Sequence, residues 1–301
     1  MLAVIVALVG ALVYGSADFL GGLAARRLTS LIATAVAVAS GLIVLFVLTP
    51  IVGFAWVTSD LVWGALSGVF GVIALLLLYA CLAIGPMSIL SPLTAVVSAI
   101  APMTWGLTVG GETLAPFGYA GLGVAVVAVV LVGFVPERGA VRPSLRGVVM
   151  AIGAGVAVGG LLICLDQTGE ASGFTPLVTG RAVNLVIVLL IIAVVVLRRR
   201  SSSAGTSAGS GTGAGAGTGA GSWDRRGWML AIGCGILDTT ANALLLAALR
   251  IGDLSIVSAL TALYPAGTIL LAALVLRERI APVQWVGLAL ALAAGALLGA
   301  A

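Results

Sequence analysis

Long apolar stretches alternate with short polar or glycine–proline segments along almost the whole chain. Each stretch is close to the roughly 20 residues that an α-helix needs to cross about 30 Å of hydrocarbon. Ten of them lie at about 2–23, 31–48, 62–83, 87–108, 116–134, 147–166, 175–197, 228–249, 254–276 and 282–300. The pattern therefore predicts an all-α polytopic membrane protein with ten transmembrane helices.

Composition supports this class and excludes several others. Hydrophobic residues make up 61% of the chain and charged residues 8%, which is too apolar for the surface of a soluble domain. The sequence contains neither lysine nor histidine, so neither type can activate a serine nucleophile. An ATP-binding motif is also missing. We therefore expect a protein that is not an enzyme and that uses no cofactor.

The cysteines and the net charge reduce the number of expected ligands and binding partners. Cys81, Cys164 and Cys234 fall inside predicted spans at unrelated spacings, which argues against a disulfide framework and against a metal site. The net charge of +4 arises from arginines, and no basic patch with interleaved aromatic residues accompanies them. Nucleic acid is therefore not an expected partner. The expected partners are the lipid bilayer and a small-molecule substrate.

The chain repeats itself. Gly85–Ala95 (GPMSILSPLTA) matches Gly252–Ala262 (GDLSIVSALTA) at an offset of 167 residues. This indicates two copies of one five-helix unit, the first at 1–135 and the second at 146–301. A stretch of Gly, Ser, Ala and Thr at 201–222 interrupts the second copy, and its composition predicts a flexible loop between spans 7 and 8.

Arginine placement predicts the orientation of the chain. The loops after spans 1, 5, 7 and 9 carry the arginines, whereas the opposite face has only Arg250 at a helix end. Under the positive-inside rule these loops are cytoplasmic, which places both termini outside. Because each unit has five spans, the second must enter the membrane upside down. The sequence thus predicts two inverted five-helix repeats.

Several short motifs carry a family resemblance. The opening segment Tyr14–Leu23 (YGSADFLGGL), the pair Gly111–Glu112 and its counterpart Arg277–Glu278, together with the repeat, resemble the EamA family of the drug/metabolite transporter superfamily. The resemblance implies a central cavity walled by spans 1, 3, 4, 6, 8 and 9, and transport of small metabolites or amphipathic compounds, with export favoured. Family members often have both termini in the cytoplasm, and here the arginines predict the reverse.

Charged residues inside predicted spans are candidate site residues, because each needs a partner or a wet cavity. Asp238 lies near the midplane of its span, with Asn242 on the same face one turn later. Either the two form a proton or substrate site, or they hold the helices together by hydrogen bonds. Asp18 shares a face with Tyr14, and pairing with Arg26 or Arg27 is the alternative to a functional role.

Arg181 lies early in span 7, on the face opposite the basic loops. It could pair with Asp166 or snorkel to the interface. Alternatively, it could bind a substrate carboxylate.

Hydroxyl side chains form matched stripes in spans 4 and 9. The candidate site residues are Ser91 and Thr94 in the first stripe and Ser258, Thr261 and Tyr264 in the second, with Tyr79 of span 3 as a further aromatic candidate. Prolines in or beside both spans free backbone carbonyls. We therefore expect broken helices at equivalent places in both halves, close to the substrate site.

Together these observations predict a secondary transporter of the cell membrane. It would alternate access between its two halves, with Asp238 as the first candidate to bind a coupling proton and Asp18 as the second. A non-transporting membrane scaffold is the alternative that the sequence leaves open. Substrate identity and the choice between a monomer and a homodimer are open as well.

Overall fold

The computed structural model describes residues 1–301 except 53–54, 85–86, 134–143, 205–223, 278–279 and 301. The side chains of residues 51–52, 79, 82–84, 87–88, 91 and 199–204 also lie outside the description. In the described residues the order of helices is α1 (Leu2–Ala25), α2 (Ser30–Val52), α3 (Thr58–Ile84), α4 (Met87–Thr108), α5 (Pro116–Gly133), α6 (Leu145–Asp166), the 3-10 turn η1 (Glu170–Ser172), α7 (Thr175–Ala204), α8 (Arg225–Ile251), α9 (Leu254–Thr261), α10 (Pro265–Val275) and α11 (Pro282–Ala300).

The described helices make this a multi-pass membrane protein. Nine of the described segments are long and apolar enough to cross a bilayer, and the span Leu254–Val275 comprises α9 and α10 together. The apolar part of α4, Pro92–Thr108, is shorter. All ten predicted stretches therefore coincide with described helices. The helix α7 continues to Ala204, so it takes in the first residues of the predicted loop at 201–222, and the rest of that loop lies outside the described residues.

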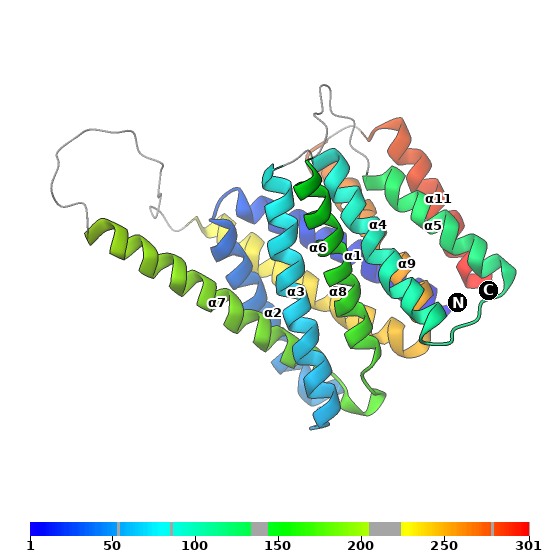
Figure 1. The fold of residues 1–301 in the computed structure, drawn as a ribbon, viewed down its shortest axis with the longest axis horizontal. Coiled ribbons are helices and arrows are strands. Elements are labelled where there is room, and N and C mark those ends of the chain that lie inside the picture. Colours follow the sequence, from blue (N-terminus) through cyan, green and yellow to red (C-terminus); the bar gives the residue numbers. More distant parts are fainter. Residues whose placement is uncertain (53–54, 85–86, 134–143, 205–223, 278–279, 301) are drawn as a thin grey trace.

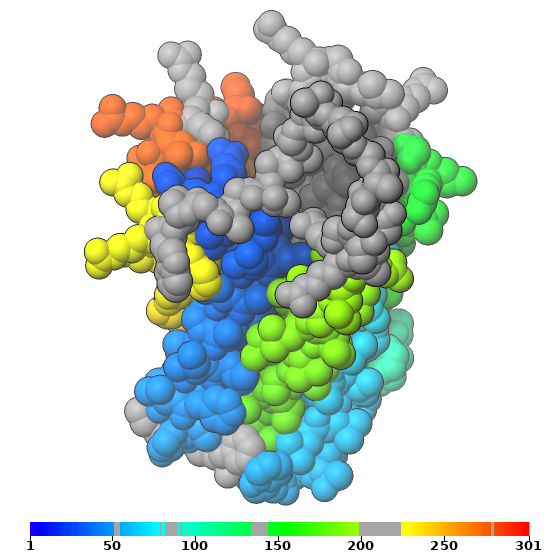
Figure 2. Space-filling model, turned by 90° about the vertical axis from the view of Figure 1, so that its left-hand side faces the viewer, coloured from blue at the N-terminus to red at the C-terminus, as the bar shows by residue number. Residues whose placement is uncertain are grey.

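The helices pack in two reciprocal arrangements. Helix α1 lies against α8, and α6 lies against α3 (Figure 1). In the same way α10 and α9 cover α1, and α4 covers α6. Helix α5 packs on α11, and α7 runs between α2 and α3 on one side of the molecule (Figure 2). The packing of α1 on α8 thus has a counterpart in that of α6 on α3, and the packing of α9 and α10 on α1 has one in that of α4 on α6.

The two proline-bearing spans differ in structure. The chain turns at Ala262–Tyr264 between α9 and α10, where the amides of Leu263 and Tyr264 donate to carbonyls three residues back. Pro265 begins α10 and has no amide hydrogen to donate, which is why the helix restarts there. In contrast, α4 continues through Pro92 and Pro102 as one helix. The prediction of a break in both halves is wrong for α4, whose prolines occupy other positions along the span.

Helix α1 is held tightly against the break between α9 and α10. A Cβ atom on Gly15 would lie 2.1 Å from the carbonyl oxygen of Tyr264 and 2.7 Å from the amide nitrogen of Thr268. The hydroxyl of Thr268 donates a hydrogen bond to the Gly15 carbonyl oxygen, 3.0 Å away. Only glycine permits this approach, so the opening motif fixes where the break sits relative to α1.

Several polar contacts tie the loops together at the end of the molecule that carries both termini (Figure 1). The Glu112 carboxylate accepts hydrogen bonds from the amides of Leu254 and Ser255, at 2.7 and 3.0 Å. It therefore caps the start of α9, which belongs to the other half of the chain. At the same end, Arg250 donates to the Gly173 carbonyl oxygen at 2.6 Å, and Asp60 accepts from the Gly169 amide at 3.0 Å.

Candidate functional site

A cavity of about 370 Å³ lies between the two halves. This volume is at the lower end of the range of small-molecule sites, roughly 300–1,000 Å³. Its walls include residues of α1, α3, α4, α6, α8 and α9, as the family resemblance implies, and also residues of α2 and α7. Nine of the eleven predicted site residues line it: Tyr14, Asp18, Thr94, Arg181, Asp238, Asn242, Ser258, Thr261 and Tyr264. The other two, Tyr79 and Ser91, have side chains outside the described residues.

Asp238 of α8 and Arg181 of α7 form an ion pair in the cavity wall. The side chains are 25% and 11% exposed, so both are mostly withdrawn from water. The sequence suggested that Arg181 pairs with Asp166, and that prediction is wrong. Asp166 instead accepts a hydrogen bond from the Gln167 side chain at 3.2 Å. The ion pair partly offsets the cost of two charges in this setting, because each supplies the other's counter-charge.

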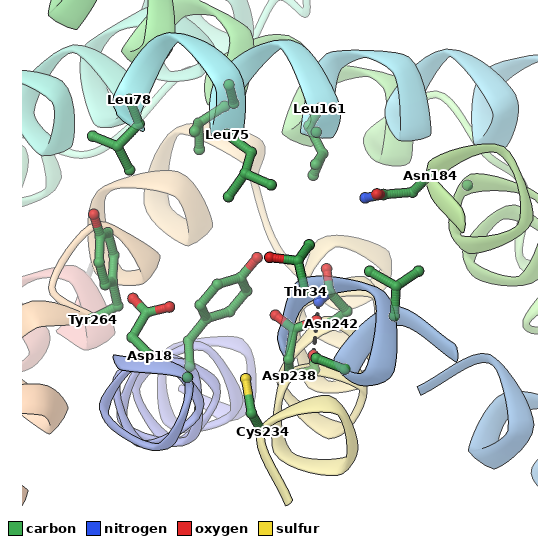
Figure 3. Close-up of a pocket in the computed structure, with 18 of the residues that line it drawn as sticks. Asp18, Thr34, Leu75, Leu78, Leu161, Asn184, Cys234, Asp238, Asn242 and Tyr264 are labelled. Carbon is green, nitrogen blue, oxygen red and sulfur yellow. Dashed lines mark hydrogen bonds between the residues drawn. The ribbon is translucent and has the colours of Figure 1, made fainter. Parts of the chain in front are cut away.

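The ion pair has a close neighbour on α8. The Asn242 side chain donates to the backbone carbonyl oxygen of Asp238 at 2.7 Å, one turn earlier on the same helix. Asn242 and Asp238 therefore share a face of α8, as their spacing predicts. Both contribute to the cavity wall, where Figure 3 shows them side by side.

Asp18 lies beside two aromatic rings. The rings of Tyr14 and Tyr264 have centroids 6.1 Å apart and are tilted by 53°. Asp18 extends from α1 next to Tyr264 (Figure 3). The predicted alternative was a pair with Arg26 or Arg27, yet no ion pair of Asp18 is present in the described part of the chain, and Arg27 pairs with Asp224. The Asp18 carboxylate is thus directed into the cavity without a counter-charge.

The hydroxyl stripes serve partly to hold the helices. Thr94 donates to the carbonyl oxygens of Leu90 and Ala151, at 3.0 and 3.2 Å, and so links α4 to α6. The Ser258 hydroxyl donates to the Ser255 carbonyl oxygen at 3.1 Å within α9. By contrast, the hydroxyl oxygen of Thr261 is buried in the cavity wall, and in the described residues it has no hydrogen-bond partner.

Five further polar residues line the cavity and were not predicted as site residues: Ser30, Thr34, Ser67, Ser98 and Asn184. The spacing of Ser98 continues the stripe of span 4, and Asn184 shares a helical face with Arg181, so a signal existed for both. Thr34 and Ser67 lie in spans without an intramembrane charge, and nothing in their local sequence marked them. The side-chain oxygen of Asn184 is buried and has no partner among the described residues.

The cavity has one polar wall and one apolar wall. Figure 3 shows Asp18, Cys234, Asp238, Asn242 and Tyr264 together on one side, from α1, α8 and the turn before α10. Leu75 and Leu78 of α3 and Leu161 of α6 face them across the space. A ligand that fills the cavity therefore meets two carboxylates on one side and leucine side chains on the other.

Two acidic groups outside the spans have pKa values that their neighbours shift. Arg27 donates to Asp224 at 3.2 Å, and this hydrogen bond lowers the pKa of the Asp224 carboxyl below its usual value. Asp253, which precedes α9, has its pKa raised by burial and by the nearby Glu112 carboxylate. Neither group lines the cavity.

Comparison with known proteins agrees with this architecture. The profile of the EamA-like transporter family matches residues 145–300, which is just over half of the chain. A solved structure titled "Crystal structure of protein" aligns with 98% of this chain and 95% of its own, with a TM-score of 0.68 and 16% identity. At that identity the likeness shows the fold alone. The sequence has no match among curated proteins.

The fold and the cavity thus define a multi-pass membrane protein of the transporter type. The chain belongs to the EamA-like transporter family. The matched segment coincides with the predicted second unit, which begins at 146.

Proposed function

We propose that the chain is a ten-span secondary transporter of the cell membrane, which moves a small metabolite or amphipathic compound by alternating access. The observation that carries this proposal is the cavity, which lies between the two halves and has the ion pair of Arg181 and Asp238 in its wall. Charged groups at this depth are costly, and they persist where they bind a substrate or an ion. Export is the direction that the family resemblance favours.

Two inverted five-helix repeats would supply the moving parts. The offset of 167 residues that relates Gly85 to Gly252 also relates the first and last residues of α3 to those of α8, and those of α4 to the start of α9 and the end of α10. The reciprocal packing of α1 on α8 and of α6 on α3 supports the same relation. Rocking of one half against the other would then expose the cavity to each side in turn.

A proton is the coupling ion that we propose, with Asp238 as its binding group. Protonation of this carboxylate would break its ion pair with Arg181 and so weaken the contact between α8 and α7. That change in packing would link proton uptake to movement of the halves. Asp238→Asn should therefore abolish transport against a gradient, while exchange of substrate down its own gradient persists.

The test is a transport screen in proteoliposomes with and without a pH gradient. We expect at least one metabolite or amphipathic compound to accumulate only when the gradient is present, and Asp238→Asn to remove that accumulation. If Asp238→Asn accumulates the compound at the wild-type rate, Asp238 is structural. If no compound moves in a broad screen, the alternative of a non-transporting scaffold is favoured.

The proposed orientation places both termini outside and the arginine-bearing loops inside. Reporter domains that are active on only one side of the membrane test this directly. A reporter inserted in the loop between α7 and α8 should be active in the cytoplasm, and one at the C-terminus should be active outside. The reverse pattern would overturn the orientation and leave the number of spans unaffected.

A further inference from the structure

The charges in the cavity wall do not balance. Three charged side chains line the cavity: Asp18, Arg181 and Asp238. Arg181 and Asp238 neutralise each other as an ion pair. The remaining group, Asp18, gives the wall an excess of one negative charge when its carboxyl is ionised. An ionised carboxyl group in a membrane interior is stabilised by a cation beside it, and the described wall supplies Asp18 with none, so a ligand could provide one.

The surroundings of Asp18 leave room for that partner. More than a third of the Asp18 surface is exposed, and it lines the cavity. In the part of the chain that the structure describes, Asp18 has no hydrogen bond and no ion pair, while Arg27 is engaged with Asp224. The open carboxylate can therefore be reached by a ligand that enters the cavity.

The aromatic rings beside Asp18 favour an organic cation over a metal ion. Tyr14 and Tyr264 present two tilted rings with centroids 6.1 Å apart. The faces of aromatic rings attract ammonium groups, and methylated ammonium groups bind there with little cost of desolvation. A carboxylate next to two such rings matches the chemistry that recognises a substituted ammonium group.

The opposite wall defines the rest of the ligand. Leu75, Leu78 and Leu161 face Asp18 and Tyr264 across the cavity (Figure 3). An apolar group of the ligand would lie against these leucines and gain from removal of its surface from water. The volume of about 370 Å³ limits the ligand to a small molecule.

We propose that this cavity binds a small monovalent organic cation, with its ammonium group between the Asp18 carboxylate and the rings of Tyr14 and Tyr264, and its apolar body against Leu75, Leu78 and Leu161. The proposal rests on the proposed transport function, because it names the substrate class of the same cavity. In this proposal Asp18 binds the positive charge of the ligand, because Asp238 is already paired with Arg181.

Binding to the purified protein in detergent tests the charge requirement. The probes are benzyltrimethylammonium, its net-neutral analogue benzyldimethylamine N-oxide and the anion phenylmethanesulfonate, each titrated by calorimetry. Benzyltrimethylammonium has no dissociable proton, so its charge is constant at every pH. We expect it to bind at least about tenfold more tightly than either analogue, as a paired charge in a partly dry site implies. Equal or tighter binding of an analogue, or no binding of the cation, would overturn the proposal.

Variants locate the site. Asp18→Asn should weaken binding of benzyltrimethylammonium by about tenfold or more, and Asp18→Glu should restore part of it. Tyr264→Leu should weaken it by about two- to thirtyfold, the range of a cation–π contact. Glu170→Gln removes a carboxylate on η1, outside the cavity wall, and is the matched control with unchanged binding. Gel filtration and thermal unfolding verify that each variant is folded. Wild-type affinity in both Asp18→Asn and Tyr264→Leu would sink the proposal.

Transport of the same cation into proteoliposomes separates this proposal from the proposed function. If benzyltrimethylammonium binds through Asp18 and is not transported, the assignment of the site stands and the transport function fails. If the protein transports neutral or anionic compounds and rejects the cation, the transport function stands and the assignment of substrate class is wrong.

Discussion

The two walls of the cavity are built alike and differ in chemistry. On the polar side, Gly15 of α1 brings that helix against the break before α10. On the apolar side, Gly155 of α6 does the same against α4, where an added Cβ would lie 2.7 Å from the Thr94 carbonyl oxygen. The chemistry differs, because the offset of 167 residues that relates α3 to α8 makes Gly71 of α3 the position equivalent to Asp238 of α8. The glycine packing is thus similar on both sides, while the two carboxylates, Asp18 from the first half of the chain and Asp238 from the second, lie on one side of the cavity.

This difference separates two kinds of constraint. Glycines at close helix contacts are fixed by steric fit, which both halves must satisfy in the same way. The choice of polar residues at the cavity depends on the ligand that it binds, and a ligand can be recognised by polar groups on one wall. Mutations can therefore test the two constraints independently.

The largest effect is expected from the ion pair in the polar wall. Arg181→Ala leaves the Asp238 carboxylate without its counter-charge and should destabilise the protein by about 3–5 kcal/mol. The double variant Arg181→Gln with Asp238→Asn removes both charges and should recover most of that loss. Thermal unfolding in detergent measures both. A double variant as unstable as the single one would mean that the cost comes from packing and not from charge.

Glycine substitutions should act alike in both halves. Gly15→Ala and Gly155→Ala each force a methyl group into neighbouring backbone, and we expect about 1–3 kcal/mol of destabilisation from either. Gly22→Ala is the matched control on α1, because a Cβ there meets no atom within 4 Å. Unfolding midpoints of the three variants provide the comparison. Loss of stability in only one half would contradict the idea that the two halves share their packing.

Glu112 should contribute less, through the start of α9. Glu112→Ala removes the acceptor of the Leu254 and Ser255 amides and should cost about 0.5–2 kcal/mol, as loss of a helix cap does. Glu112→Gln keeps one acceptor oxygen and should cost less. The same unfolding assay ranks the two variants. If the order is reversed, the hydrogen bonds of the cap do not account for the loss of stability.

The smallest effect is expected at Asp224, outside the cavity. Because Arg27 lowers the pKa of this carboxyl, their contact stabilises the fold above the ordinary aspartate pKa and is lost as the pH falls through the lowered value. The pair is exposed, so Asp224→Asn should leave the unfolding midpoint at neutral pH almost unchanged. A clear drop at neutral pH that vanishes in acid would show a stronger contact than an exposed pair provides.

Much of this architecture could be predicted from periodicity and composition. The apolar stretches marked every described helix, because a helix that crosses lipid must be apolar over a fixed length. Intramembrane Asp18, Arg181 and Asp238 indicated the cavity, since charges are rare there. What each charge pairs with could not be predicted. Arg181 and Asp238 are 57 residues apart, and their contact depends on how α7 and α8 each pack against α2.

The sequence also could not predict which of the two proline-bearing spans is broken. Proline in the middle of a span is compatible with a kinked continuous helix or with a break, and the choice depends on which neighbour accepts the freed backbone groups. Near Pro265 the chain packs closely on Gly15 of α1, from the other half of the chain, and Thr268 donates to the Gly15 carbonyl oxygen. At Pro92 and Pro102 the helix continues. Thr34 and Ser67 reach the cavity through similar long-range packing.

The two ends of the chain lie close together (Figure 1), with the side chain of Met1 against Gly299. Chain order and helix packing are therefore separable in this molecule. A circular permutant that joins the ends through a short linker and opens the loop between α7 and α8 would keep every helix contact described above. It would also transfer both new ends to the opposite side of the membrane, where a tag could be attached next to the arginines.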